Sequence, residues 1–450
     1  MGTNICPATP LLKHPSAAPE DAGAKFVLES KGTWLHAGYH LTSATAGTPL
    51  LALPYAMAAL GWTPGLIALV VAAVISFYTC YMLSLTVEKL ELDGKHCLRF
   101  WDVALHTIGP SWAYYVVAPL QYLGCFIVVV ALILLGGQTL EGIFAEILVD
   151  NILKLYDCIV IVGIFVLFLS QLPSFHSLRH LNLLSTLLCL GFCICGIAGS
   201  VISGLSSEAP IKDYSVQGSS IHIMFGVFNS VSIMMTAYAN PIIVEIQATL
   251  EPPSTAKILK GLLVCYSVVL STFFSVSISG YWAFGNSVAG VVFTSMEPFA
   301  PLWLTILGNA FGCIQTIIAT VVYLQPMFAK YEGMVADVNA EQFSLRNVFP
   351  RIVGRSLLVG IAVLLAAMLP FFEDFSALMG AFGFIPLCII LPLWFYNVVF
   401  DGKRTLRNRL VHMLNGVIIG ISMVVTALGT IAAVRKIVLD IDTYSLFPAS

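Results

Sequence analysis

Long apolar runs alternate with short polar stretches along almost the whole chain, a pattern typical of a membrane protein with many spans. Most of the runs have the length that an α-helix needs to cross a bilayer. They predict eleven helices, at 33–60, 64–87, 111–137, 157–170, 181–204, 221–248, 258–282, 301–329, 352–370, 375–399 and 410–434. A short surface helix is also expected within the polar stretch 88–110. The predicted fold class is therefore an all-α polytopic membrane protein.

Two of the predicted spans are interrupted in the same way. The first contains ATAGTP at 44–49, where Thr48 can cap a new helix and Pro49 then occupies its first position. The sixth contains Asn240 followed by Pro241, with Asn240 as the cap. Unpaired peptide groups in hydrocarbon are costly, so a broken helix persists only where it lines a polar cavity. Paired breaks in two halves of a chain indicate the binding site of a secondary transporter. Two ordinary proline kinks are the alternative.

The composition agrees with a membrane protein. Only 10% of the 450 residues are charged, against about 25% in soluble domains. The basic residues form no patch interleaved with aromatic side chains, so nucleic-acid binding is not indicated and the expected surroundings are the lipid bilayer. Most of the 11 cysteines fall inside apolar spans, where they are interpreted as small core residues without a disulfide framework.

The distribution of basic residues predicts an orientation. With eleven spans the two chain ends lie on opposite sides, and most of the 21 lysines and arginines fall on the side of the N-terminus. Basic residues stay in the cytosol, so the N-terminus is expected inside and the C-terminus outside. The expected organisation is a cytosolic tail at 1–32, a five-helix repeat at 33–204, an extracellular loop at 205–220, an inverted five-helix repeat at 221–400, and an eleventh helix with an extracellular C-terminus at 401–450.

The two breaks provide the candidate substrate site. Free N–H groups near Pro49 can bind a carboxylate without Lys or Arg, and neither is predicted deep inside any span. Carbonyls freed at the helix ends can bind an amine, while the Tyr238 hydroxyl either adds a contact or simply packs in the bundle. The candidate substrate-binding residues are Ser43, Ala44, Thr45, Gly47, Thr48, Tyr238, Ala239 and Asn240.

Glu245, Asn309 and Thr316 are the candidates for coupling or gating. Glu245 is the only acid predicted well inside a span, which makes it a candidate carrier of a coupling proton. The alternative is a structural acid that backbone or water satisfies. Asn309 and Thr316, with Gln315 and Thr320, form a polar stripe that either lines the pathway or holds helices together.

Metal chemistry is not indicated. The pairs His36 with His40 and His176 with His180 have His-x3-His spacing, which membrane di-iron oxygenases use together with adjacent His-His motifs. This chain has nine histidines and no adjacent pair. It also lacks a nucleophile motif and a phosphate loop, so we predict no metal, no cofactor and no enzymatic activity.

Several stretches of the chain resemble the amino acid/auxin permease family, and within it the plant GABA-transporter branch. They are DAGAKFVLESKG at 21–32, HLTS at 40–43, LPYA at 53–56, SQLPSFHSLRH at 170–180, EIQATL at 245–250, SISGYWAFGN at 277–286 and GAFGFIP at 380–386. The resemblance implies the fold of bacterial leucine transporters, a five-plus-five inverted repeat with discontinuous helices one and six. It also implies proton-coupled amino-acid uptake at the plasma membrane. On this fold a sodium site needs adjacent hydroxyls late in helix eight, and Thr316 and Thr320 lie a turn apart, so protons are favoured over sodium.

The chain departs from that branch at the second break. The branch usually has Gly-Asn-Gly there and a Pro before the Glu, whereas this chain has Ala239, Pro241 and Val244. Without the glycines a tighter kink and a differently shaped pocket are expected. GABA or a related small zwitterion is the predicted substrate. A proline or neutral amino-acid permease and a sensor that binds without transport are the alternatives.

Overall fold

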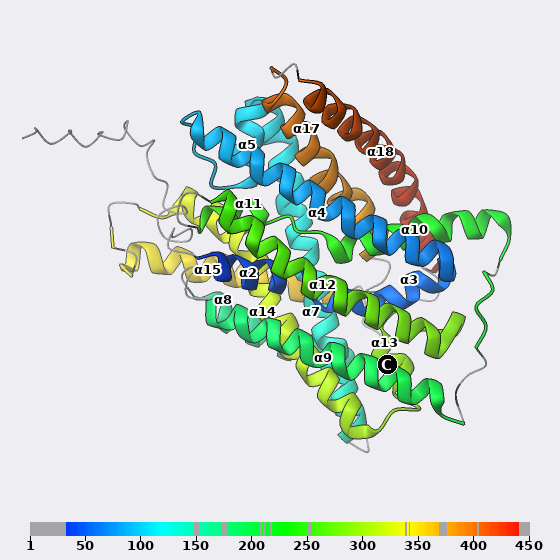
Figure 1. The fold of residues 1–450 in the computed structure, drawn as a ribbon. Helices are drawn as coiled ribbons and strands as arrows, with labels where there is room; N and C mark the ends of the chain where they lie inside the picture. The colour runs from blue at the N-terminus through cyan, green and yellow to red at the C-terminus, as the bar shows by residue number, and fades with distance from the viewer. Residues whose placement is uncertain are drawn as a thin grey trace, which may run out of the picture.

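The computed structural model describes residues 33–147, 153–172, 179–207, 209, 212–216, 218–250, 254–337, 340–341, 343–368, 376–402 and 405–440, without the side chains of 48, 179, 180, 182 and 440. The predicted N-terminal tail and the last ten residues lie outside this part. All regular elements within it are helices (Figure 1).

The first half of the chain forms the elements up to residue 205. They are α2 (Trp34–Thr45), η1 (Thr48–Ala52), α3 (Leu53–Leu60), α4 (Trp62–Leu92), α5 (Phe100–Thr107), α6 (Pro110–Trp112), η2 (Ala113–Val117), α7 (Ala118–Ile147), α8 (Leu155–Ser170) and α9 (Arg179–Leu205). The short helix α5 occupies the polar stretch where a surface helix was predicted.

The second half forms the remaining elements. They are α10 (Ser220–Tyr238), α11 (Ile243–Ala248), α12 (Thr255–Phe284), η4 (Gly285–Ser287), α13 (Val292–Met296), α14 (Leu302–Val335), α15 (Leu345–Met368), η5 (Met379–Phe384), η6 (Pro386–Ile390), α17 (Leu391–Val399) and α18 (Leu406–Asp440). η2, η5 and η6 are π-helical turns.

The fold class predicted from the sequence is confirmed. In the described part of the chain, nine helices are long and apolar enough to cross a membrane, and Pro49–Leu60 and Leu155–Ser170 are shorter apolar helices. These eleven segments correspond to the predicted spans. The eighth continues to Val335, six residues beyond its predicted end.

The broken first span lies inside the bundle (Figure 1). α2 packs against α12 and α9, while α3 packs against α10, and α7 and α14 form the most extensive helix pair. Glycines allow these close approaches: a Cβ on Gly136 of α7 would lie 2.9 Å from Oγ1 of Thr316, and one on Gly137 only 2.4 Å from the Ile159 side chain. α18, at one edge of the bundle, is the least buried span.

Candidate functional site

The first break lies between α2 and η1. Ala46 has φ −79° and ψ 69°, Gly47 is extended at φ −108° and ψ −179°, and helical geometry resumes at Thr48. Gly47, rather than Thr48, therefore holds the capping position, and Pro49 is the second residue of the new turn. The capping residue was predicted one position too far along the sequence, because a short 3-10 turn precedes α3. The Thr48 side chain lies outside the described part.

The second break lies between α10 and α11. Ala239 is extended at φ −71° and ψ 140°, and a turn at Pro241 and Ile242 leads into α11. The residue at the capping position is Ile242, so the prediction of Asn240 as the cap is wrong. Ala239 needs no left-handed backbone, and the break therefore forms without the glycines of the related branch.

The Asn240 side chain connects the two breaks instead of capping a helix. Its Nδ2 donates to Oγ1 of Thr45 over 3.1 Å. Next to it, the Tyr323 hydroxyl of α14 donates to the carbonyl of Ala44 over 2.8 Å. The carbonyl of Tyr238, freed at the end of α10, accepts from the Ser76 hydroxyl at 2.8 Å. We call the two breaks, 44–49 and 239–242, together with these partners the break site.

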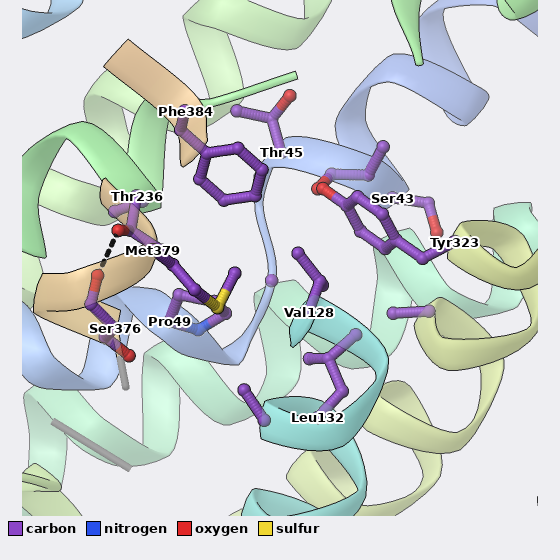
Figure 2. Close-up of a pocket in the computed structure, with 15 residues that line it drawn as sticks. Ser43, Thr45, Pro49, Val128, Leu132, Thr236, Tyr323, Ser376, Met379 and Phe384 are labelled. Carbon is purple, nitrogen blue, oxygen red and sulfur yellow. Dashed lines mark hydrogen bonds between the residues drawn. The ribbon is translucent and has the colours of Figure 1, made fainter. Parts of the chain in front are cut away.

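A cavity of about 30 Å³ lies at the break site, enough for only one or two water molecules. Figure 2 shows Ser43 and Tyr323 on one side of it, Thr236, Ser376 and Met379 on the other, and Val128 and Leu132 of α7 between them. The lining is Ser43, Ala44, Thr45, Gly47, Pro49, Val128, Ala131, Leu132, Thr236, Ala237, Ala319, Tyr323, Ser376, Met379 and Phe384. None of these side chains carries a formal charge.

Gln315 of α14 lies beside the first break. Its side chain is 0% exposed, and neither amide atom has a hydrogen-bond partner among the described residues. Its Nε2 is 3.6 Å from where a Cβ on Gly47 would stand. Gln315, Ala319 and Tyr323 are spaced four residues apart, so they share the face of α14 that meets the break. Each unsatisfied buried polar group costs about 1–3 kcal/mol, which a ligand at the break could recover.

Glu245 lies on α11, directly after the second break, and is 1% exposed. Its Oε1 accepts from Nε2 of Gln121 on α7 at 2.6 Å and from the N–H of Phe100 on α5 at 3.1 Å. Its Oε2 has no partner in the described structure. One carboxylate thus joins α11, the second half of the sixth span, to α7 and to α5.

Asp102 supports α5 at the same end. Its carboxylate accepts from the N–H groups of Leu98 at 3.1 Å and Arg99 at 2.9 Å. Burial raises the pKa of Asp102, and the neighbouring Arg99 opposes that increase. The N-terminus of α5, which presents the Phe100 N–H to Glu245, is therefore itself fixed by a partly buried acid.

The remaining candidates lie away from the cavity lining. The Tyr238 ring packs against Phe273 at 4.9 Å between ring centroids, and its hydroxyl has no partner among the described groups. Thr316 donates to the Cys313 carbonyl at 2.8 Å and faces Gly136, while Asn309 faces Gly142. The structure therefore brings together Ser43, Ala44, Thr45 and Gly47 with Asn240 but places Asn309 and Thr316 against α7.

Histidine pairs do not assemble into a site in the described structure. His36 Nδ1 accepts from the Thr33 N–H at 3.0 Å. Among the residues searched, no group of three or more His, Cys, Asp or Glu is placed to hold a metal ion. His176 and the His180 side chain lie outside the described part.

A buried group of charges contradicts the prediction that no arginine lies deep within a span. Arg355 of α15 is 0% exposed, and it donates from Nε to Oε1 of Glu332 at 3.1 Å and from Nη2 to the same oxygen. Its Nη1 donates to the carbonyls of Ser170 and of Leu172, the latter at 2.8 Å. Arg351 Nε lies 3.4 Å from Glu332. We call Glu332, Arg351 and Arg355 the ion-pair cluster.

The ion-pair cluster was not predicted, because the hydrophobic pattern ends the eighth span before Glu332 and both arginines count among the basic residues on the cytosolic side. Glu245 is accordingly not the only acid inside a helix of the bundle. The pairing of Glu332 with an arginine 23 residues away would have been detectable only if α14 had been extended to Val335.

Comparisons with known proteins agree with the fold. The profile described as transmembrane amino acid transporter protein matches residues 30–435. GABA transporter 1 of Arabidopsis thaliana is 44% identical over 95% of both chains. Lysine histidine transporter-like 1 of the same plant is 28% identical over 92% of this chain and 90% of its own. A solved Na+-coupled sialic acid symporter shares the fold, with a TM-score of 0.52 and 10% identity over 96% of this chain and 94% of its own.

Proposed function

The chain belongs to the transmembrane amino acid transporter family, the amino acid/auxin permeases, and from this membership we propose that it takes up GABA or another small zwitterionic amino acid together with protons. It is an amino acid transporter embedded in the membrane and not an enzyme. The observation that carries the proposal is the meeting of two broken helices, joined by Asn240 and Thr45, at a cavity with an uncharged lining.

The uncharged lining favours a substrate without net charge. A lysine side chain or a second carboxylate would lose its hydration at this cavity without gaining a charged partner. A zwitterion brings both charges itself, and each can be held by neutral dipoles. The relative at 44% identity is also named as a GABA transporter, whereas the relatives near 28% are named as lysine histidine transporter-like proteins.

The carboxylate of the substrate is placed at the first break. Thr48 begins the new helical turn, a position whose N–H has no partner within the helix and carries partial positive charge. Gln315 adds a neutral N–H donor beside Gly47. The amine is placed near the hydroxyls of Ser43 and Thr236 on the cavity wall. Since the cavity of about 30 Å³ is smaller than any amino acid, alternating access must widen it on one side at a time.

Glu245 is the proposed proton carrier. Protonation removes the charge that accepts from Gln121 and from the Phe100 N–H, so it weakens the connection between α11, α7 and α5. Binding of the proton is thereby coupled to the position of α11, the inner half of a broken helix. The carbonyl of Ala44, freed at the first break, already accepts a hydrogen bond from the Tyr323 hydroxyl.

The proposed setting is the plasma membrane, with the N-terminus in the cytosol and the C-terminus outside. The two inverted repeats, 33–204 and 221–400, rock against each other around the break site. In this orientation Glu245 and the ion-pair cluster lie toward the cytosol.

Uptake in transport-deficient cells tests the function. Labelled GABA, proline, alanine and lysine are supplied with and without a proton uncoupler, and with sodium replaced by choline. We expect saturable GABA or proline uptake that the uncoupler abolishes and choline leaves unchanged. Absence of saturable uptake for every neutral amino acid would refute the proposal, and binding without accumulation would indicate a sensor.

A Glu245→Gln variant tests the coupling. Glutamine keeps the size and one acceptor of the protonated acid, so we expect binding and exchange of substrate to persist while accumulation driven by a pH gradient is lost. Glu141→Gln on α7 provides a control that also removes one glutamate. Gradient-driven accumulation by Glu245→Gln at the native level would exclude Glu245 as the carrier.

A further inference from the structure

A second, larger cavity lies where the appended last helix meets the outer halves of the two broken spans. Its volume is about 240 Å³, and α3, α10 and the C-terminal end of α18 enclose it. The lining is Tyr55, Ala59, His222, Phe225, Gly226, Asn229, Ser230, Ala432, Arg435, Lys436 and Leu439. Figure 1 shows the end of α18 reaching α10 at this place. The break-site cavity is separate and shares none of these residues.

The described residues that line this cavity contribute formal charge of one sign. Arg435 and Lys436 of α18 are basic, His222 of α10 lies among them, and none of the described lining residues is acidic. The Arg435 guanidinium lies over the Phe225 ring, 4.9 Å from its centroid. This cation–π contact holds the side chain against the cavity wall and leaves its N–H donors available to a ligand.

A buried amide completes the inner wall. Asn229 is only 6% exposed, and its Oδ1 has no hydrogen-bond partner among the described residues. Ser230, beside it on α10, is 2% exposed. A polar group buried without a partner is costly, so the amide marks a position where a bound molecule could supply the missing hydrogen bond.

We propose that this cavity binds an oxyanion, a carboxylate or phosphate group on a small molecule or on a lipid head group. Arginine binds carboxylate and phosphate through paired N–H groups, and the lysine ammonium adds a second charge. The apolar surfaces of Phe225 and Leu439 would contact the body of the ligand. A hydroxyl or protonated group of the ligand would reach Asn229.

The position of the site gives the ligand a way to act on the transporter. An occupant would touch α18 together with α3 and α10, the helices that begin or end at the two breaks. It would therefore favour the arrangement in which these three helices lie together, and by that preference shift the population of states. This inference does not depend on the substrate, because it can be tested on purified protein without transport.

Thermal unfolding of the purified full-length protein in detergent provides the test. The probes are sodium phosphate, succinate and short-chain phosphatidylglycerol, with sodium chloride at equal ionic strength and short-chain phosphatidylcholine as controls. We expect at least one anionic probe to raise the unfolding temperature by a few degrees over its control. A shift with phosphate or succinate identifies a soluble ligand, and a shift with phosphatidylglycerol alone identifies a lipid.

Two variants with equal charge decide whether the cavity is responsible. Arg435→Gln with Lys436→Gln should abolish the shift, whereas Arg407→Gln with Arg409→Gln, at the other end of α18, should retain it. If the first variant does not fold, His222→Gln and Asn229→Ala should each reduce the shift. No shift with any anion, or an equal shift in both charge variants, would overturn the proposal.

Discussion

The break site and the ion-pair cluster are both buried polar regions of one bundle, but the cluster is held by ion pairs whereas the cavity at the break site is lined by uncharged groups. In the cluster, Arg355 donates to Glu332 and to two carbonyls at the end of α8, so three helices are tied by charges. At the break site no charge is present in the lining, and Gln315 has no partner among the described residues.

This difference gives the two regions different roles: the ion-pair cluster keeps helices in place, and the break site can rearrange around a ligand. Charges that are paired across helices hold α8, α14 and α15 in a single arrangement, since any displacement exposes an unpaired buried charge. Neutral groups left partly unsatisfied cost less and can change partners when a ligand arrives. A transporter needs both kinds of region, one to hold helices together and one to exchange contacts. α14 contributes to both, with Gln315 near its middle and Glu332 in its last turn.

Breaking the ion-pair cluster is expected to have the largest effect. Arg355→Met leaves Glu332 buried without its main partner, and removal of one partner of a buried pair typically costs about 3–5 kcal/mol. Thermal unfolding in detergent should show a pronounced loss. The double variant with Glu332→Met removes both charges and should lose less than Arg355→Met alone. Equal stability of Arg355→Met and the native protein would show that the cluster does not hold the helices.

Removing the amide of Gln315 is expected to act on the substrate instead of the fold. Gln315→Leu should raise KM for the transported amino acid by about 10- to 100-fold, the effect of about 1–3 kcal/mol, with unfolding temperature unchanged or higher. Gln325→Leu is the matched control, because Gln325 is also a buried glutamine of α14 with an unpartnered amide in the described structure, whereas Gln315 is the one placed beside Gly47. An unchanged KM in Gln315→Leu, or the same rise in both variants, would remove Gln315 from the site.

The contact between the two breaks should be weaker. A double-mutant cycle of Asn240→Ala and Thr45→Val measures the hydrogen bond that joins them, and we expect a coupling energy of about 0.5–1.5 kcal/mol from unfolding data. The initial rate of uptake should change more than stability, since this bond must break if the halves move apart. A coupling energy of zero would mean that the breaks are positioned independently.

The smallest effect concerns an acid outside both regions. Burial, together with the charges of Glu146 and Glu141, raises the pKa of Glu297. A raised pKa means that the folded protein binds this proton more tightly than the unfolded chain does. The stabilisation from this tighter proton binding is complete below the pKa of the unfolded chain, about 4.3, and is lost as pH rises through the pKa of the folded protein.

Glu297→Gln should therefore reduce the loss of stability between pH 5 and pH 7. We expect a change below about 1 kcal/mol, because the side chain is partly exposed and screened. Unfolding temperatures measured at both pH values check this, with the exposed Glu341→Gln as the control. An unaltered pH dependence in Glu297→Gln would show that the acid is solvated in both states.

The hydrophobic pattern predicted the spans and both breaks, because the cost of unpaired backbone in a bilayer makes an interruption conspicuous in sequence. It did not predict the residues at the caps. Gly47 precedes an unexpected 3-10 turn, and Asn240 turns to Thr45 on another helix, a contact that depends on tertiary structure. The π-helical turns at Met379–Phe384 and Pro386–Ile390, one of which brings Met379 and Phe384 to the cavity, likewise have no periodic signal.

The polar stripe of α14 shows the same limit at the level of side chains. Its composition was visible in the sequence, but only the rotation of the helix decides that Gln315 meets the break while Thr316 faces α7. The burial of Arg355 and Glu332 was not predicted for another reason. Charges near the ends of spans are interpreted as solvated, whereas these two side chains are buried between helices. The hydrophobic pattern determines which helices form, whereas the packing of these helices determines which residues their side chains contact.

The extended backbone of Gly47 and Ala239 has a consequence for how such transporters vary. Neither residue has the left-handed backbone conformation that favours glycine. The space around each break therefore limits which residues can occupy it. At Gly47 an added methyl would come within 3.2 Å of the Pro49 ring, which allows little growth, whereas position 239 already holds an alanine. Homologues can thus exchange glycine for other small residues at the second break, which changes the shape of the cavity beside it. By such exchanges one fold can come to transport different substrates.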